Sequence, residues 1–529
     1  MKHTDIIRKL NLEQKCALLS GETVFTTRAL PGRGIPSITL SDGPNGVRKQ
    51  AGAADHLGLN PSVPATCFPT SSATACSWDE KLGEAVGEAM GEEAAAQEVA
   101  VLLGPGLNIQ RSPLCGRDFE YFSEDPILAG KMAAAYVRGI QKKGIAACPK
   151  HFAVNSQELR RMASDSVVDE RTLRELYLTG FEIVVKEARP KTIMTSYNLI
   201  NGTYANENAH LLQDILRKDW GFDGAVVTDW GGSNDHALGV KNGSTLEMPC
   251  PGGDSIRELM KAVKDGKVTE ADLDARLDEL LELVLSTHAA VEKAPRTFDA
   301  AAHHALARRA AAESIVLLKN EDGILPLKAG EKLAVIGDFA QTPRYQGAGS
   351  SAVNALQVDT LLDCIKADDS GISFVGYASG FDRQGAADPK KQEEAVSLAK
   401  QADTVLLCLG LDELRESEGL DRADMALAEN QQQLLDAVAA VNPNVVVLLS
   451  AGAPVETPWV GRCKALVYGA LGGQAGAGAA ADILTGKLCP CGKLSQTWAK
   501  AHDDTPAKAN FRRCEACLPL RLRPELHHL

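Results

Sequence analysis

Residues 224–230 read GAVVTDW, a short β-branched run that ends in a carboxylate, Asp229, and an indole. Similar apolar runs recur along the first 290 residues and begin at Gly34, Val101, Ala147, Thr192 and Ser244. Helical patterns lie between them, such as 125–144, which starts with an acidic cap and a proline and stops at a glycine. Strand-then-helix units repeated at this spacing predict a parallel sheet closed into a (β/α)8-type barrel over 1–290.

A second set of strand-like runs follows the barrel segment and begins at Lys332, Ile372, Thr404, Asn444 and Ala465. Their continuous apolar character is typical of parallel strands that helices cover on both faces. We therefore expect an α/β protein in which a parallel α/β layered sandwich domain over 311–503 follows the barrel. The stretch 291–310 is predicted to be a weakly structured linker, and 504–529 an atypical tail without a clear period.

Length and net charge limit the kinds of molecule that the chain is expected to bind. The chain has 529 residues, more than one core usually serves, and its 56 basic against 69 acidic residues give a net charge of -13. This charge disfavours nucleic acid and anionic membranes as partners, although it also simply aids solubility. Charges interrupt the N-terminal apolar run, and no stretch approaches the ~20 apolar residues of a membrane span. We therefore expect no signal peptide and no membrane partner.

The thirteen cysteines are odd in number and scattered, as reduced thiols usually are, so a cytoplasmic location is expected. Cys489 and Cys491 form a CPC run, and Cys514 and Cys517 form a CEAC run. Neither run has a second ligand pair at zinc-finger spacing. We expect no metal and no other cofactor.

Asp229 stands where a strand leaves the sheet, and in a barrel the carboxyl ends of the strands share one mouth. An aspartate in that place also commonly caps the next helix. Other polar residues follow strand-like runs in the same way: Asp42, Arg117, Lys150, His151, Arg161 and Tyr197. Cations beside a carboxylate keep it ionised and donate hydrogen bonds to sugar hydroxyl groups. The alternative is a set of ion pairs that only holds the barrel together.

The glycine-rich stretch 346–351 could be taken for a phosphate-binding loop. It lacks both the GxGxxG order and the position between a strand and a helix, which disfavours nucleotide binding.

The order of several long motifs resembles glycoside hydrolase family 3. The first domain contains SDGPNGVR, GRDFEYFSEDP, KHFAVNSQE, SYN, TDW and LEMP, followed by KNEDGILPL. The second continues with QGAGSSAVN, ESEGLDRADM, SAGAPVETPW and LGGQAGAGAAADILTGKLCPCGKLSQTW. The resemblance covers roughly residues 5–500.

This resemblance assigns roles to residues. It implies that Asp229 is the nucleophile and that Glu418, from the second domain, is the general acid/base, with Glu416 as the competing candidate. It implies that the sugar is held by Asp42, Arg117, Lys150, His151, Arg161, Tyr197, Trp230 and Met248. The loop 346–351 resembles the one that approaches this site. For a retaining mechanism we expect an ionised Asp229 and a Glu418 whose pKa is raised.

The resemblance implies a retaining, exo-acting β-glucosidase that forms a covalent glycosyl-enzyme intermediate on small β-glucosides or cello-oligosaccharides. KHFAVNSQELR departs from the pattern of the N-acetylglucosaminide subgroup, which carries a histidine-bearing loop. A β-xylosidase or α-arabinofuranosidase of the same fold stays open, because one hydroxymethyl group separates these sugars. A catalytically impaired sugar-binding protein and a metal-dependent barrel hydrolase are further alternatives.

Many members of the family continue into a fibronectin-like third domain, whereas this chain ends about thirty residues after the GKLSQTW motif. We expect the surface that such a domain would cover to be buried in a homodimer.

Overall fold

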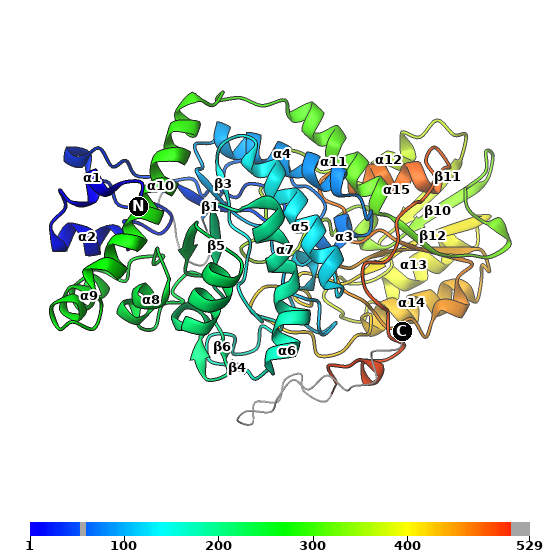
Figure 1. Ribbon diagram of the computed structural model, residues 1–529. Helices are drawn as coiled ribbons and strands as arrows, with labels where there is room; N and C mark the ends of the chain where they lie inside the picture. Colours follow the sequence, from blue (N-terminus) through cyan, green and yellow to red (C-terminus); the bar gives the residue numbers. More distant parts are fainter. Residues whose placement is uncertain (53–59, 509–529) are drawn as a thin grey trace.

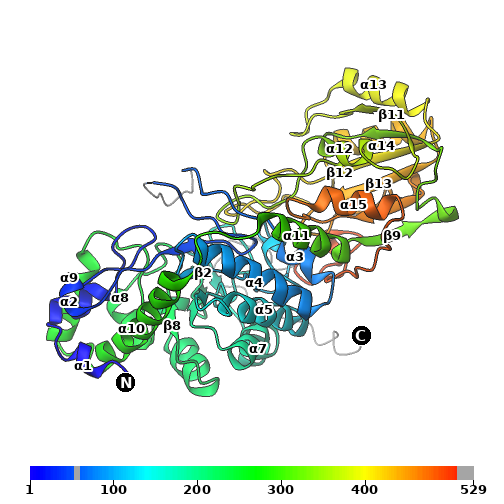
Figure 2. The same cartoon turned by 90° about the horizontal axis from the view of Figure 1, so that it is seen from above.

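The computed structural model describes residues 1–52 and 60–508, which form two α/β units side by side (Figures 1 and 2). The first unit is a barrel of very short parallel strands. One sheet has the order β1-β2-β3, and β5 pairs with β8. The bounds are β1 (Leu40–Asp42), β2 (Val101–Leu103), β3 (Ala146–Ala147), β5 (Thr192–Met194) and β8 (Ala225–Val227).

Isolated bridges continue the ring between these strands. They join Phe152 to Thr195, Val227 to Leu246 and Ser20 to Glu247, all in parallel. An antiparallel bridge between Thr26 and Thr39 then brings the first segment back beside β1. The expected α/β barrel is therefore confirmed, with strands of two or three residues and with a bridge where the run STLEMP was expected to form a strand.

Helices surround the barrel strands (Figure 1). The longest are α4 (Glu80–Ala96), α5 (Pro126–Gln141), α9 (Asp254–Lys264) and α10 (Glu270–Lys293). The shorter ones are α1 (Thr4–Ile7), α2 (Leu12–Leu18), α3 (Ser71–Ala75), α6 (Glu170–Thr172), α7 (Thr179–Ala188) and α8 (His236–Asn242). Two π-helical segments are Leu173–Leu178 and His210–Asp219, and a small sheet joins β4 (Asp165–Ser166), β6 (Leu199–Ile200) and β7 (Thr203–Tyr204).

Glycines set the packing of α4 against α5. A Cβ on Gly87 would lie 2.4 Å from the carbonyl oxygen of Tyr136, and a Cβ on Gly91 would lie 2.5 Å from that of Ile140. The two helices therefore touch backbone to backbone, which any larger residue would prevent. Helix α5 begins as the sequence predicts, because the Asp125 side chain accepts hydrogen bonds from the first turn and Pro126 follows it.

The second unit is a six-stranded sheet between helices. Its order is β11-β10-β12-β13-β14-β9, and every pair is parallel except β14 with β9. The strands are β9 (Val316–Asn320), β10 (Lys332–Ile336), β11 (Ser373–Ala378), β12 (Thr404–Gly410), β13 (Val445–Ser450) and β14 (Ala465–Tyr468). The helices are α12 (Leu361–Lys366), α13 (Pro389–Ala399), α14 (Glu429–Ala439) and α15 (Gly476–Leu484). The layered sandwich is confirmed, and its antiparallel edge strand β9 is an addition to the predicted set.

The linker expected over 291–310 is wrong in extent. Helix α10 continues to Lys293 and α11 (Ala300–Ser314) begins after six intervening residues, so 294–299 alone connects the two helices. The Asp299 side chain accepts a hydrogen bond from the backbone N–H of Ala302 and starts α11. Alanine, the strongest helix former, fills this segment, and Ala307 and Ala310 are buried.

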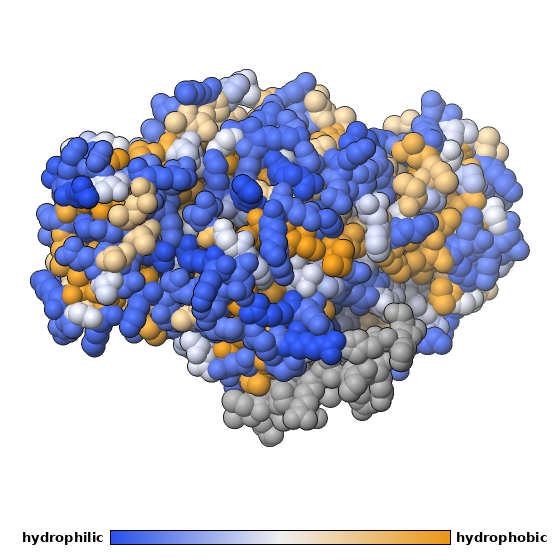
Figure 3. All heavy atoms as spheres, in the orientation of Figure 1, coloured by the Kyte–Doolittle hydropathy of each residue, from blue (hydrophilic) through white to orange (hydrophobic). Residues whose placement is uncertain are grey.

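The surface of the barrel unit is mainly hydrophilic on the face shown in Figure 3. Smaller apolar areas are scattered among this hydrophilic surface, as expected where helices bury one side. Within 1–52 and 60–508, every helix is too short or too polar to cross a membrane.

The tail predicted over 504–529 lies largely outside the described residues, and its CEAC run lies entirely outside them. Cys489 and Cys491, which form the CPC run, are exposed.

Candidate active site

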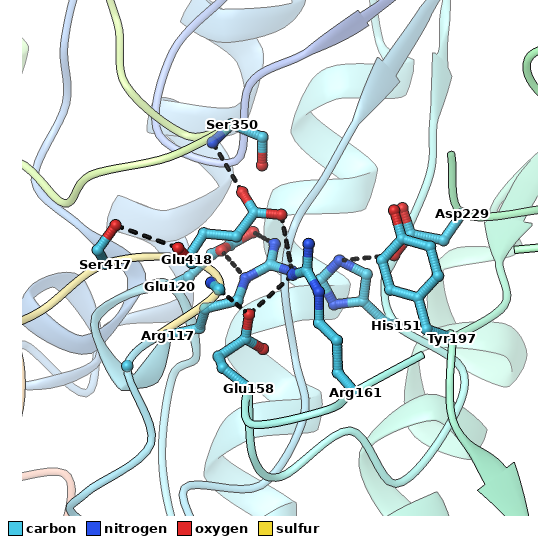
Figure 4. A network of polar contacts seen from close by, with 12 residues as sticks. Arg117, Glu120, His151, Glu158, Arg161, Tyr197, Asp229, Ser350, Ser417 and Glu418 are labelled. Carbon is cyan, nitrogen blue, oxygen red and sulfur yellow. Dashed lines mark hydrogen bonds and ion pairs between the residues drawn. The ribbon is translucent and has the colours of Figure 1, made fainter. Parts of the chain in front are cut away.

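A cavity of about 250 Å³ opens at the carboxyl ends of the barrel strands, where loops of the sandwich domain approach the barrel (Figure 4). All but one of the predicted site residues line it. These are Asp42, Arg117, Lys150, His151, Arg161, Tyr197, Asp229, Trp230 and Glu418. The barrel fold thus collects polar side chains from turns that are far apart in the chain.

Asp229 lies in the turn that follows β8 and is largely buried. Its Oδ1 accepts a hydrogen bond of 2.8 Å from the backbone N–H of Trp230. Its Oδ2 lies 3.7 Å from His151 Nε2 and accepts no hydrogen bond within the described part of the chain. One carboxylate oxygen is thus anchored to the turn, and the other is left for whatever enters the cavity.

Two cations are held at the cavity wall by a buried glutamate. Arg117 donates through Nε and a terminal nitrogen to both oxygens of Glu120, at 2.8 and 2.9 Å. Lys150 Nζ lies 3.5 Å from Glu120 Oε1. Paired in this way, both cations can stay charged in a buried place and can donate hydrogen bonds into the cavity.

The structure separates the two candidate acid/base residues. Glu418 Oε1 lies 2.9 Å from an Arg161 nitrogen, and its Oε2 accepts a hydrogen bond of 2.7 Å from the backbone N–H of Ser350 (Figure 4). Glu416 turns the other way, and both of its oxygens accept from the backbone N–H of Gly452, at 2.9 and 3.0 Å. Glu418 therefore reaches the cavity, and Glu416 is a buried support of the sandwich domain.

The raised pKa expected for Glu418 is wrong for this structure. Burial alone would raise the pKa of Glu418, but the guanidinium groups of Arg117 and Arg161 outweigh it and hold that pKa well below its usual range. Burial raises the pKa of Asp229, although Arg161, Arg117 and Lys150 oppose this. The pKa of Glu418 is lowered instead of raised because the arginines lie nearer to it than the sequence can show.

Two further groups carry shifted pKa values. Burial raises the pKa of Asp42 to about 6, although Lys150 and Arg48 lower it. Burial and three nearby cations hold the pKa of His151 well below its ordinary value, so its imidazole is neutral. A neutral imidazole and a partly protonated carboxyl group can both donate and accept hydrogen bonds, which suits a ligand rich in hydroxyl groups.

The assignment of Met248 to sugar binding is not supported. Its side chain is buried and does not line the cavity, and a Cβ on Gly21 would come within 2.7 Å of its sulfur. Its backbone oxygen accepts hydrogen bonds from Gly231 N–H and from the Thr228 hydroxyl group. Met248 therefore supports the turn that carries Asp229, while Met194 lines the cavity.

An aromatic wall bounds one side of the cavity. The rings of Phe25 and Trp230 are 5.1 Å apart, and the indole N–H donates a hydrogen bond of 2.8 Å to the carbonyl oxygen of Val24. Tyr197 O–H donates to the carbonyl oxygen of Trp230, and the Arg161 guanidinium lies 4.8 Å from the Tyr197 ring centre. Such faces pack well against the C–H surface of a ring-shaped ligand.

Sequence reasoning missed part of the lining. Phe25 and Gln50 follow no strand end that the sequence marks, so their contribution depends on how the chain folds back. Met194 ends strand β5, but it is apolar and is not among the polar strand-end residues that the sequence suggests. Gly349 and Ser350 belong to the loop 346–351, which does approach the site as the resemblance implied. Over the described residues, no group of three or more histidine, cysteine, aspartate or glutamate side chains could hold a metal ion.

Two family descriptions match the chain. Residues 53–283 match the glycosyl hydrolase family 3 N-terminal domain, and residues 315–521 match the glycosyl hydrolase family 3 C-terminal domain. The two matches correspond to the barrel and the sandwich domain.

Curated relatives and solved structures agree with these matches. The chain is 46% identical to thermostable beta-glucosidase B of Acetivibrio thermocellus, over 96% of the chain and 67% of that protein. It is 45% identical to an exo-alpha-(1->6)-L-arabinopyranosidase of Bifidobacterium longum, over 96% and 68%. The crystal structure of a Bifidobacterium adolescentis GH3 beta-glucosidase superimposes with a TM-score of 0.90 at 43% identity, over 96% of this chain and 73% of that one. The chain thus spans about two thirds of the curated relatives' length.

Proposed function

This chain belongs to glycosyl hydrolase family 3 and is an O-glycoside hydrolase, and we propose that it is a retaining, exo-acting β-glucosidase. Its substrates would be terminal non-reducing β-D-glucosyl residues of small β-glucosides or cello-oligosaccharides. One observation carries the proposal: Asp229 of the barrel and Glu418 of the sandwich domain line the same cavity, among donors suited to sugar hydroxyl groups. The relatives named as β-glucosidases support it.

In the first step, an oxygen of ionised Asp229 attacks the anomeric carbon and forms an ester bond to it. The bond between that carbon and the leaving oxygen breaks, and the leaving oxygen takes the proton of Glu418. Asp229 Oδ2 suits this attack because it accepts no hydrogen bond from the described residues.

In the second step, a water molecule gives a proton to the Glu418 carboxylate as its oxygen bonds to the anomeric carbon. The ester bond to Asp229 breaks, and the sugar leaves with its original configuration. Arg117 and Arg161 face Glu418, at 3.5 and 2.9 Å, and hold its carboxyl group in the ionised form. A sugar whose hydroxyl groups accept those N–H bonds would compete for the arginines and raise the pKa of Glu418 for the first step.

The test is a set of initial rates on aryl glycosides, with Asp229→Ala as the blank. The panel contains a β-glucoside, a β-xyloside, an α-arabinofuranoside and an N-acetyl-β-glucosaminide. Preferential release from the β-glucoside, lost in the variant, is the expected result. Proton NMR of the first product separates retention from inversion, and initial release of the α-anomer would contradict the mechanism. Binding of glucose without any turnover would favour a sugar-binding protein.

A second candidate activity follows from one comparison. The relative from Bifidobacterium longum is named an exo-alpha-(1->6)-L-arabinopyranosidase and is nearly as similar as the first β-glucosidase. An aryl α-L-arabinopyranoside therefore joins the panel. A higher kcat/KM on it than on the β-glucoside would replace the proposed substrate while keeping the hydrolase.

A cytoplasmic homodimer is part of the proposal. Eleven cysteines in the described residues are free, which suits a reducing compartment. Large apolar side chains are exposed at Met162, Leu414 and Leu420, which suits a contact between copies. Light scattering at micromolar concentration should give the mass of a dimer, and a monomer alone would contradict it.

A further inference from the structure

The turn that carries Glu418 is pressed against a barrel loop. Ser417 and Leu420 form an antiparallel bridge, so residues 417–420 make a tight turn. A Cβ on Gly116 of the barrel would lie 1.6 Å from the carbonyl oxygen of Leu420 and 2.4 Å from that of Ser417. Since no side chain fits in that space, the glycine allows the turn to sit directly on barrel backbone.

Asp421, three residues after Glu418, fastens this turn to two barrel loops. Its Oδ1 accepts hydrogen bonds from the backbone N–H groups of Gly116, at 3.1 Å, and Glu158, at 3.0 Å. Its Oδ2 accepts from the backbone N–H of Leu159, at 2.9 Å. A carboxylate that accepts from several amides forms charge-assisted bonds, which are stronger and more directional than bonds between neutral groups.

A return contact fixes the other end of the turn. Glu158 Oε2 accepts a hydrogen bond of 2.8 Å from the backbone N–H of Gly419 and one of 2.7 Å from Arg161. The same Arg161 nitrogen lies 2.9 Å from Glu418 Oε1 (Figure 4). The sandwich turn thus gives a carboxylate to barrel amides, and the barrel gives a carboxylate to a turn amide.

We propose that Asp421 is a positioning residue for the acid/base, because its carboxylate fixes the Glu418 turn against the barrel amides of Gly116, Glu158 and Leu159. This inference rests on the proposed role of Glu418. Asp421 itself does not line the cavity, so it acts through Glu418. Its loss should impair proton transfer to the leaving group and leave nucleophilic attack by Asp229 largely intact.

The test compares leaving groups. For Asp421→Asn, kcat/KM on phenyl β-glucoside, whose leaving group needs a proton, should fall at least about tenfold. On 2,4-dinitrophenyl β-glucoside, which departs unprotonated, it should fall by less than about threefold. Azide, which attacks the glycosyl-enzyme without a general base, should raise kcat on the dinitrophenyl substrate. Activity on that substrate also shows that the variant is folded.

Gly116→Ala is an independent second variant, since its Cβ would push on the same turn, and it should show the same selectivity. Glu418→Gln is the reference for complete loss of the acid/base. The matched control is Asp424→Asn, because Asp424 lies in the same loop but, among residues 1–52 and 60–508, accepts a hydrogen bond only from the nearby Ala426 N–H and faces Arg415. It should behave as the parent on both substrates.

Equal losses on both substrates in Asp421→Asn and Gly116→Ala, or no loss on either, would overturn the inference. If Glu418→Gln itself shows no dependence on the leaving group, the proposed role of Glu418 fails instead. The two failures are therefore distinguishable.

Discussion

The two halves of the site are built differently. On the barrel side, Asp229 follows a core strand, and its turn is held by barrel groups: Gly232 N–H donates to the Asp229 carbonyl oxygen, and the Thr228 hydroxyl group to that of Met248. On the sandwich side, Glu418 sits on a turn that is held by its own unit, through the backbone of Ala348 and Ser350, and also by contacts that cross to the barrel, through Asp421 and Gly116.

Because of this difference, the nucleophile and the acid/base depend on different contacts for their positions. The nucleophile and most sugar donors are positioned by the barrel alone, because strand ends of one fold already meet there. The acid/base gains part of its positioning, and its place beside Asp229, from the docking of the two units. Changes to Asp229 and its turn should therefore affect every substrate alike, and changes to Glu418 or to the contacts that hold its turn should depend on the leaving group.

The largest effect is expected on the barrel side. Asp229→Ala removes the nucleophile and should lower kcat/KM by about 10⁴-fold or more on all active glycosides, whatever the leaving group. Rates on phenyl and 2,4-dinitrophenyl β-glucosides check this. A much smaller loss on the activated substrate would mean that Asp229 is not the attacking group and would break the comparison.

The next effect is expected on the sandwich side. Glu418→Gln should lower kcat/KM on phenyl β-glucoside by about 10²–10⁴-fold and change it far less on the dinitrophenyl substrate. Glu416→Gln is the matched control, two residues away but turned toward Gly452. Glu416→Gln should keep the leaving-group dependence of the parent. If Glu416→Gln, and not Glu418→Gln, selectively loses activity on phenyl β-glucoside, Glu416 is the acid/base instead.

Much of the fold could be predicted because its strands carry strong apolar signals. The sandwich strand β12 is buried along its whole length and its sequence, TVLLCLG, is apolar throughout. Edge strand β9 has a weaker signal, since its run VLLKN contains a lysine and is only partly buried. The sequence predicts a linker where helix α11 lies, because alanines and histidines give this segment no clear apolar face. The position of helix α11 in the structure follows from its packing against other elements and not from its sequence pattern.

The site could be predicted where backbone geometry alone gathers side chains. Lys150, His151 and Asp229 follow barrel strands, so their meeting is a property of the fold. Phe25 and the direction of the Met248 side chain depend on turns that carry no sequence signal. The expected pKa direction of Glu418 is wrong for a related reason, because it depends on how far Arg117 and Arg161 reach across the domain boundary.

A third prediction concerns Asp42, whose buried carboxyl group lowers the stability of the barrel half at neutral pH. Burial raises the pKa of Asp42 to about 6, above the ~3.9 of an unfolded chain. Its contribution to stability is present in full below the unfolded value and is lost as the pH rises through about 6. Asp42→Asn should therefore raise the free energy of unfolding above pH 6, by at most about 3 kcal/mol at ~1.4 kcal/mol per pKa unit, while activity falls.

Thermal unfolding of parent and variant at pH 4 and pH 7.5 checks this prediction. The difference in Tm should be larger at pH 7.5 and small at pH 4, where both side chains are uncharged. An equal difference at the two pH values would show that the titration of Asp42 contributes nothing to it.

The smallest effect concerns Arg161, which faces both halves. Its guanidinium lies 2.9 Å from Glu418 and also lowers the pKa of Asp229. Arg161→Gln removes that charge, so both carboxyl pKa values should rise, and the bell-shaped pH profile of kcat/KM should move to higher pH on both limbs. Normalised profiles on 4-nitrophenyl β-glucoside measure this shift separately from weaker sugar binding.

The control for Arg161→Gln is Arg415→Gln, because Arg415 belongs to the same domain as Glu418 but pairs with Asp424. Movement of one limb alone would mean that Arg161 acts on one carboxylate, and the two halves would then titrate independently despite sharing a cavity.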